Sequence, residues 1–428
     1  MIFCKKAGWG MVLLFLCLIF GTGRTQKIEA AVQNVPESLE EESRLDTVGT
    51  DQETERAAVR EKKGQQEKEA GDTETDQAAA AQDELLAELD FDAIQQEVDS
   101  LLSSQQFSFA GTVRSLLQDG DPFRTFRAGN AVLSCAKTAF LAQKGLMKEL
   151  FLLVLAGAVL GSFSSLFEGK QVRDASFYMV YLLALALILK NFQSSGANLK
   201  AVITSLVAFM RILTPSYYLA AAAAGGASSA VMFYQMLLLV ILAVEKLLLA
   251  LVLPMIHIYL LIALVNDLSG EEILSHMTEL LETCVNGLLK SSLGVLVGMQ
   301  MIRNLIAPAL DSLRQMALWR TAGMIPGIGN AVNAVTELVA GSAVLIRNCF
   351  GVTAMLVLLA AGMVPAVQLL VSGLSFRLLA AAAQPVSDKR IAGCLAAAGK
   401  GYAMLLRLLL TVEVLFLLTI AILAGTFS

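Results

Sequence analysis

The sequence has few of the residues on which enzymes rely. Only two of its 428 residues are histidines and 16% are charged, against about a quarter in a typical soluble domain. It contains no His-Glu-x-x-His, P-loop or Gly-x-Ser-x-Gly motif. Its six cysteines have neither paired nor Cys-x-x-Cys spacing, so neither a disulfide framework nor a zinc site is indicated. These absences predict a protein that is not an enzyme and binds no metal or cofactor.

The basic residues are also not clustered as in a nucleic-acid-binding surface. Residues 24–90 hold 8 basic and 19 acidic residues, a net charge of −11 in a chain whose total is −5. The remainder is therefore mildly basic, but it has no basic patch with interleaved aromatic residues. We expect no nucleic-acid partner.

Long apolar segments are what the chain has in abundance. They follow one another from residue 149 to residue 424, and 56% of the whole chain is hydrophobic. In hydrocarbon every backbone polar group must be paired internally, so apolar runs of this length predict spanning helices. We expect an all-α fold, with residues 149–428 forming a polytopic helical membrane domain.

The N-terminus predicts export. Lys5 and Lys6 precede the apolar run 10–20, and small residues follow, which is typical of a signal peptide over residues 1–23. An uncleaved anchor helix is the alternative. Residues 24–81 contain no aromatic residue and are predicted to be a disordered, acidic, extracytoplasmic tether. Residues 82–148 follow as a small extracytoplasmic helical region, which we expect to dock on the membrane domain or on a partner.

We expect about six to eight spans after the leader. The clearest are residues 150–167, 176–192, 230–253, 349–371 and 403–423; the others are residues 199–224, 255–265, 285–310 and 331–346. Gly157-x-x-x-Gly161 and Gly294-x-x-x-Gly298 predict close helix contacts, most simply within the chain.

Orientation follows from the basic linker at Lys389 and Arg390. Loops rich in Lys and Arg stay in the cytoplasm, which places the C-terminus outside. A signal peptide leaves residues 82–145 outside as well, so an even number of spans is predicted.

Polar positions inside apolar sequence are the candidate functional residues. An unpaired charge at bilayer depth costs about 3 kcal/mol, so each must find a partner or water. The alternative is that some of these residues mark helix ends, where a long side chain reaches the headgroups. This interpretation is preferred for Arg303 and Arg347. A Pro-Gly-rich segment also predicts either a re-entrant break or a plain turn. The candidates are Glu245, Lys246, Arg303, Pro326, Gly327, Gly329, Glu337, Arg347 and Glu413.

Several strings in the membrane part resemble one protein family. They are residues 253–268, 304–312, 325–330, 341–348 and 384–391, and they resemble the stage III sporulation protein AE family. The resemblance covers about residues 84–428, whereas the tether matches only in character.

The resemblance implies a role in endospore-forming bacteria. Family members are expected in the mother-cell membrane around the forespore, as subunits of a secretion-like channel joining the two cells. Implied partners are other membrane proteins of the same sporulation operon, their ATPase and, indirectly, a forespore membrane protein. The resemblance implies no catalytic residues. The rival readings are a self-sufficient ion-coupled transporter and a passive membrane scaffold.

Overall fold

The computed structural model describes residues 90–102, 107–119, 128–164, 170–223, 227–269, 274–322 and 329–425. All secondary structure in this part of the chain is helical, as the sequence predicts. The predicted leader and tether lie outside the described residues. The helices are α3 (Phe91–Leu101), α4 (Phe109–Asp119), α5 (Ala128–Ser164), α6 (Lys170–Ala223), α7 (Ala227–Ala243), the π-helix η2 (Val244–Val252), α8 (Leu253–Ser269), α9 (Ser275–Ala322), α10 (Gly329–Ala383) and α11 (Lys389–Gly425).

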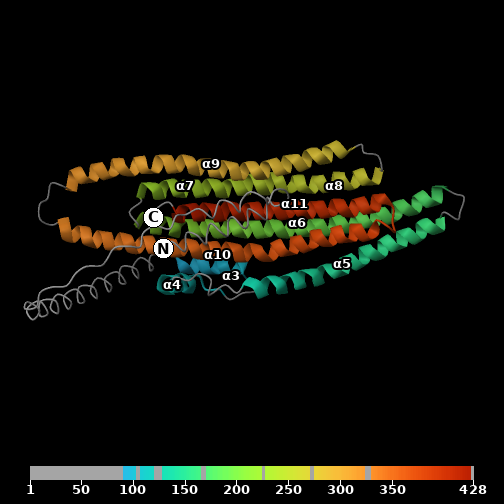
Figure 1. Ribbon diagram of the computed structural model, residues 1–428, viewed down its shortest axis with the longest axis horizontal. Helices are drawn as coiled ribbons and strands as arrows, with labels where there is room; N and C mark the ends of the chain where they lie inside the picture. The colour runs from blue at the N-terminus through green and yellow to red at the C-terminus, as the bar shows by residue number, and fades with distance from the viewer. Residues whose placement is uncertain are drawn as a thin grey trace, which may run out of the picture.

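The helices form an elongated bundle in which the long ones lie side by side along one axis (Figure 1). The longest, α6 and α10, have 54 and 55 residues. At a rise of 1.5 Å per residue each is about 80 Å long, more than twice the hydrocarbon thickness of a bilayer.

Five helical segments of the described chain are long and apolar enough to cross a membrane. They are Phe177–Ala222, Tyr234–Ser269, Ser275–Met299, Gly341–Ala383 and Lys389–Ala421. The sequence analysis expects six to eight spans. Its number is higher because it counts as separate spans several segments that lie end to end on one continuous helix. Residues 176–192 and 199–224 share α6, and residues 331–346 and 349–371 share α10.

Proline does not end these helices. Pro215 lies inside α6 and Pro365 inside α10, and Pro254 is the second residue of α8, directly after η2. At that junction the Leu253 N–H donates to the Leu248 carbonyl, five residues back. The wider π turn lets the chain continue where proline removes a donor. Residues 230–253 and 255–265, which the sequence analysis gives as two spans, therefore contribute to one segment, Tyr234–Ser269.

Helix α11 lies at the centre of the bundle and α9 at its edge. In the most apolar stretch of α11, 72% of the residues are buried, against 17% in α9. The core cluster joins α11 to α10, α8 and α6 through side chains such as Leu408, Val357, Leu260 and Ile203.

The short helices α3 and α4 pack on α6 and α10 rather than apart from the bundle. The ring centroid of Phe350 on α10 lies 6.1 Å from that of Phe91 and 5.0 Å from that of Phe109. The Gln95 side chain joins the pair, because its amide donates to the Phe107 carbonyl and its oxygen accepts from the Phe109 N–H. Helix α5 runs unbroken through residue 148.

Candidate functional site

Glu245 forms an ion pair at the surface of the bundle. It lies in the first turn of η2, and its carboxylate accepts a hydrogen bond from Arg211 of α6. Both side chains are exposed, by 40% and 54%. Lys246, the next residue, is exposed as well. These two candidates lie on the outside of the bundle.

Glu413 and Arg347 lie in the interior instead. Each is only 1% exposed. Arg347 therefore does not reach outward to the headgroups, and its interpretation as a helix-end residue is wrong. Glu413 projects from α11 toward Gly362 of α10. Because Gly362 is 15 residues along α10 from Arg347, the two buried charges lie about 22 Å apart along the axis.

The other candidates are not assembled around them. Arg303 lies in α9 and Glu337 in α10, but their side chains lie outside the described part of the structure. Pro326 and Gly327 also lie outside it, and Gly329 is the first residue of α10. Among the candidates whose side chains are described, Glu413 and Arg347 are thus not brought together.

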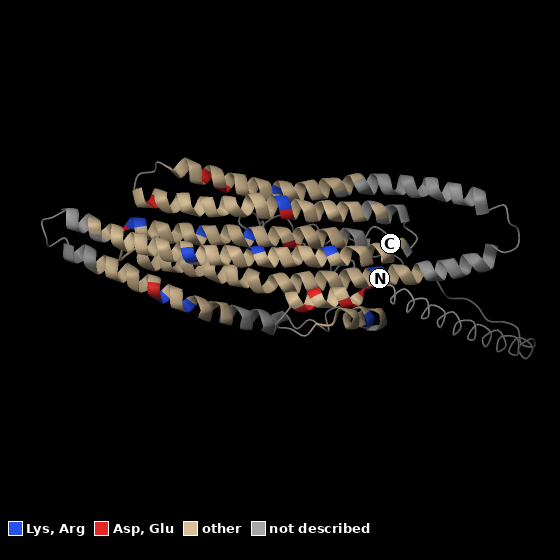
Figure 2. Cartoon of the chain, turned by 180° about the vertical axis from the view of Figure 1, so that it is seen from behind, with Lys and Arg blue, Asp and Glu red and all other residues tan. Residues whose placement is uncertain are grey.

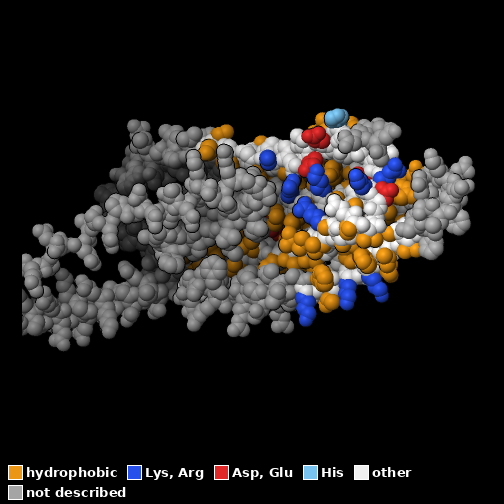
Figure 3. Space-filling model, turned by 45° about the vertical axis from the view of Figure 1, so that its right-hand side comes forward, with side chains coloured by type: hydrophobic (Ala, Val, Ile, Leu, Met, Phe, Trp, Pro, Cys, Tyr) orange, Lys and Arg blue, Asp and Glu red, His pale blue; other side chains and the backbone are white. Residues whose placement is uncertain are grey.

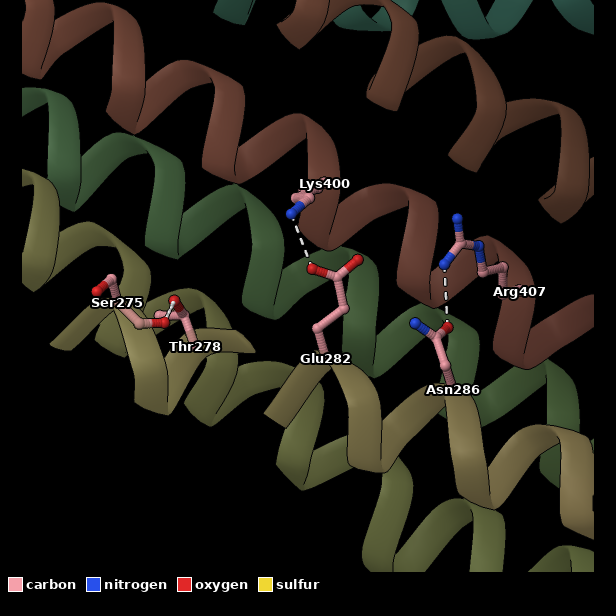
Figure 4. Close-up of polar contacts among 6 residues, drawn as sticks. All are labelled: Ser275, Thr278, Glu282, Asn286, Lys400 and Arg407. Carbon is pink, nitrogen blue, oxygen red and sulfur yellow. Dashed lines mark hydrogen bonds and ion pairs between the residues drawn. The ribbon is translucent and has the colours of Figure 1, made fainter. Parts of the chain in front are cut away.

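Polar contacts do join α9 to α11. The Lys400 ammonium lies 2.8 Å from the Glu282 carboxylate, and Arg407 donates to the Asn286 side chain at 3.0 Å. Figure 4 shows both basic side chains directed from α11 toward α9. Thr278, one turn before Glu282, donates to the Ser275 carbonyl of its own helix. The face of α9 that meets α11 is therefore polar at Glu282 and, one turn later, at Asn286.

A buried polar group lies beside these contacts. The Tyr402 hydroxyl accepts a hydrogen bond from Asn191 at 2.7 Å and lies 3.3 Å from the Ser195 hydroxyl. The Phe192 ring packs edge-on against Tyr402 and against His257 of α8. The His257 Nδ1 lies 2.9 Å from the Leu253 carbonyl oxygen.

These contacts lie at one level of the bundle. Since neighbouring helices run side by side, a contact between two of them marks a shared position along the axis. Lys400 and Tyr402 are two residues apart on α11, so the contacts of α6, α8 and α9 align there. We call this level the polar belt, and it comprises Asn191, Ser195, His257, Glu282, Asn286, Lys400, Tyr402 and Arg407.

The polar belt extends to the surface. Lys400 is 55% exposed, and Arg407, Lys190 and Lys200 are exposed too. Figure 2 shows charged residues well inside the ends of the long helices. On the face seen in Figure 3, Lys and Arg side chains gather beside an exposed hydrophobic area. Basic side chains thus interrupt the apolar surface in the middle of the bundle.

Comparison with known proteins gives the family. The family model described as stage III sporulation protein AE matches residues 107–426. The chain belongs to this family. It is also similar to the stage III sporulation protein AE of Bacillus subtilis (strain 168), with 22% identity over 291 residues, 67% of this chain and 73% of that protein. No solved structure matches.

The sequence analysis did not identify the residues of the polar belt as candidates. Lys400 and Arg407 are seven residues apart, which puts both on one helix face. Glu282 and Asn286 are four residues apart, which gives the same signal on α9. Asn191 and Tyr402 carry no such signal, because they meet only through the tertiary fold. Within the described residues, no three His, Cys, Asp or Glu side chains could share a metal ion.

Reversing the charge of Glu282 should weaken the contact between α9 and α11. The Glu282→Lys variant places two cations together, and because Lys400 is half exposed we expect a loss of up to about 1 kcal/mol of stability. The double variant with Lys400→Glu should recover most of this loss. A double-mutant cycle from unfolding in detergent measures the coupling. Glu279→Lys, at an exposed position one turn earlier on α9, is the control and should show no coupling to Lys400.

Proposed function

We propose that this protein is a membrane subunit of a secretion-like channel complex joining mother cell and forespore, needed for forespore development after engulfment. Family membership supports a role in sporulation. The observation that carries the proposal of a complex is the set of exposed charges in the middle of the bundle.

Lipid does not tolerate these charges. A Lys or Arg facing hydrocarbon at mid-depth costs about 3 kcal/mol. Arg211 and Lys400 are each more than half exposed, and Arg407 and Lys200 add to the number. We propose that partner subunits or water cover those of these positions that lie within the bilayer, as in a channel assembly.

The proposed topology uses six crossings. The five apolar segments are joined by the apolar half of α5, residues 150–164. Residues 1–23 act as the signal peptide, which delivers the acidic tether, residues 24–81, outside the cytoplasm. An even number of crossings then returns the C-terminus to the same side, with the linker at Lys389 and Arg390 in the cytoplasm. The multi-pass chain lies in the mother-cell membrane around the forespore.

The proposed partners supply what this chain does not carry. They are the other membrane proteins of the stage III sporulation operon, their ATPase and, indirectly, a forespore membrane protein. The subunit itself is proposed to have no enzymatic activity and to need no cofactor. Energy for any transport would come from the ATPase or from an ion gradient.

Gene deletion tests this proposal. Deletion should block spore formation after engulfment and leave vegetative growth unchanged, and the wild-type gene should restore spores. Restoration by a double Lys400→Leu and Arg407→Leu variant should be poor, while its level in the membrane stays normal. A normal spore yield in the deletion strain would refute the proposal.

A self-sufficient ion-coupled transporter is the second candidate, because Glu413 is a buried acid in a spanning helix. The purified chain alone would then transport a solute in vesicles, and Glu413→Gln would abolish that transport. Activity that needs the other operon products instead favours the channel subunit.

A further inference from the structure

Helix α10 carries a strip of exposed leucines on the face that points away from the bundle. Leu370, Leu374 and Leu378 follow one another at four-residue spacing, so they line one side of the helix. Their exposed fractions are 56%, 55% and 60%, whereas the inward-facing Phe376 is fully buried. The strip is an apolar surface about 12 Å long, and the described part of the chain leaves it uncovered.

A first row of basic side chains borders this strip on the side of α11. A Cβ atom on Gly399 would lie 2.9 Å from the Arg377 Cγ, so Arg377, which is exposed, lies against α11 next to Lys400. Arg407 follows Lys400 by seven residues and is exposed on the same face of α11. Glu282 pairs with Lys400, which leaves this first basic row with a net positive charge.

A second basic row lies on α5, which also packs against α10. Lys137, Lys144 and Lys148 are exposed, and their spacings of seven and four residues put them on one face of the helix. Glu149 is exposed too, but it lies about 100° around the helix from Lys148. The second basic row itself therefore carries positive charge only.

The two basic rows lie at the same level of the bundle. A Cβ atom on Gly157 of α5 would lie 3.7 Å from the Ile391 side chain of α11, and these two helices run in opposite directions (Figure 1). Lys148 and Lys400 are each nine residues from that contact, so they are level with each other. Figure 3 shows basic side chains on both sides of an exposed hydrophobic area. The leucine strip and the two basic rows thus form one face, apolar along its middle and basic along both edges.

We propose that this face binds an amphipathic helix of a partner subunit, whose apolar side packs on the leucine strip and whose flanking Asp and Glu side chains pair with the two basic rows. The proposal rests on the proposed function and names the chemistry of one partner. A helix about 10–12 Å across fits over α10 between α5 and α11, because the axes of packed helices are about 8–10 Å apart. Its carboxylates neutralise cations that hydrocarbon does not tolerate.

Lipid alone does not match this face. The second basic row extends from Lys137 to Lys148, about 16 Å along the helix axis. The headgroup region of one leaflet is only about 5–8 Å thick, because the whole bilayer exceeds its hydrocarbon core by twice that amount. Headgroups therefore meet only a part of the row, and acyl chains would contact the remaining cations. A partner helix parallel to α10 pairs with the whole row over about 11 residues, or three turns.

Photo-crosslinking in sporulating cells tests the face. The full-length protein carries p-benzoyl-phenylalanine in place of Leu374, and peptide mass spectrometry identifies what this probe captures. We expect a peptide of a different protein, with apolar residues at three- and four-residue spacing and Asp or Glu residues beside them. The control is the same probe at Leu261, which is 48% exposed on α8, a helix that contains no Lys or Arg. The control probe should not capture this peptide.

Charge reversal tests whether the basic rows select the partner. The double variant Lys144→Glu and Lys148→Glu should lower the yield of the Leu374 adduct by about tenfold or more. The level of the protein in the membrane should stay normal, because both lysines are exposed. Replacing acidic residues of the captured peptide with lysine should restore the yield. The matched control is the double variant Lys246→Glu and Lys290→Glu, at exposed positions on η2 and α9, and it should leave the yield unchanged.

Several results would overturn the inference. They are the absence of any adduct at Leu374, an adduct with lipid alone, an adduct with a second copy of this chain, and a peptide yield that the reversals on α5 leave unchanged. Failure of the proposed function gives a different result, because the deletion strain would then form spores normally. A deletion strain without spores, together with any of the results above, retains the proposed function and removes this binding face.

Discussion

Replacing Phe350 with alanine is expected to release α3 and α4 from the bundle and to lower its stability by about 3–5 kcal/mol. The Phe350 side chain is fully buried and lies against Phe91, Phe109 and Tyr217 at once. Removing it leaves a cavity among three rings on α3, α4 and α6. Two helices of 11 residues each are too short to stay folded without this support.

Hydrogen exchange of the variant in detergent measures both effects. Amides of α3 and α4 should lose protection first, before those of α10 and α11. Phe376→Ala is the control: this ring is equally buried but stacks on Tyr402, so its removal should destabilise the bundle without selective loss in α3 and α4. Unchanged protection of α3 in Phe350→Ala would show that the aromatic cluster does not hold the pair.

The sequence predicts the helices better than the number of crossings. Ile94 and Val98 lie four residues apart, at helical spacing, and both are fully buried in α3. Span counting assumed that charge and proline divide apolar sequence into membrane-length pieces. Arg211 and Pro215 instead lie within one helix, because packing against neighbours stabilises a helix through residues that would end it in isolation.

The two glycine motifs show the limit of local pattern. A Cβ on Gly157 would lie 3.0 Å from Val180, so this motif does mark a close contact within the chain. At Gly294 and Gly298 nothing lies within 4 Å of such an atom, and the predicted intramolecular contact is absent there. The spacing of the glycines is the same in both motifs. The position of each helix in the bundle decides whether another helix packs closely against them.

The candidate site was predictable in kind but not in detail. Sequence alone indicates that Glu413 and Arg347 must be accommodated somewhere, since the membrane does not tolerate them unpaired. It does not indicate that Glu413 lies against Gly362, because that contact joins residues 51 positions apart on two helices. The pairing of Glu282 with Lys400 is likewise a property of the fold.

A close approach of α10 to α11 predicts a damaging small-to-large change. A Cβ on Gly399 would lie 2.9 Å from the Arg377 Cγ and 3.3 Å from the Gly373 carbonyl oxygen, and one on Gly373 would lie 3.3 Å from the Tyr402 Cβ. Backbone atoms cannot move aside as a flexible side chain does. Gly399→Leu should therefore separate the two helices and lower stability by about 3 kcal/mol or more.

The same separation should disturb the hydrogen bond between Asn191 and Tyr402, which depends on the position of α11. Size-exclusion chromatography and thermal unfolding in detergent measure the outcome, with Gly399→Ala expected to show a smaller loss. Gly294→Leu is the control, because that glycine faces open space on α9 and should leave the monomer's melting temperature unchanged. Equal melting temperatures for Gly399→Leu and the wild type would mean that α10 and α11 do not approach as closely as the structure places them.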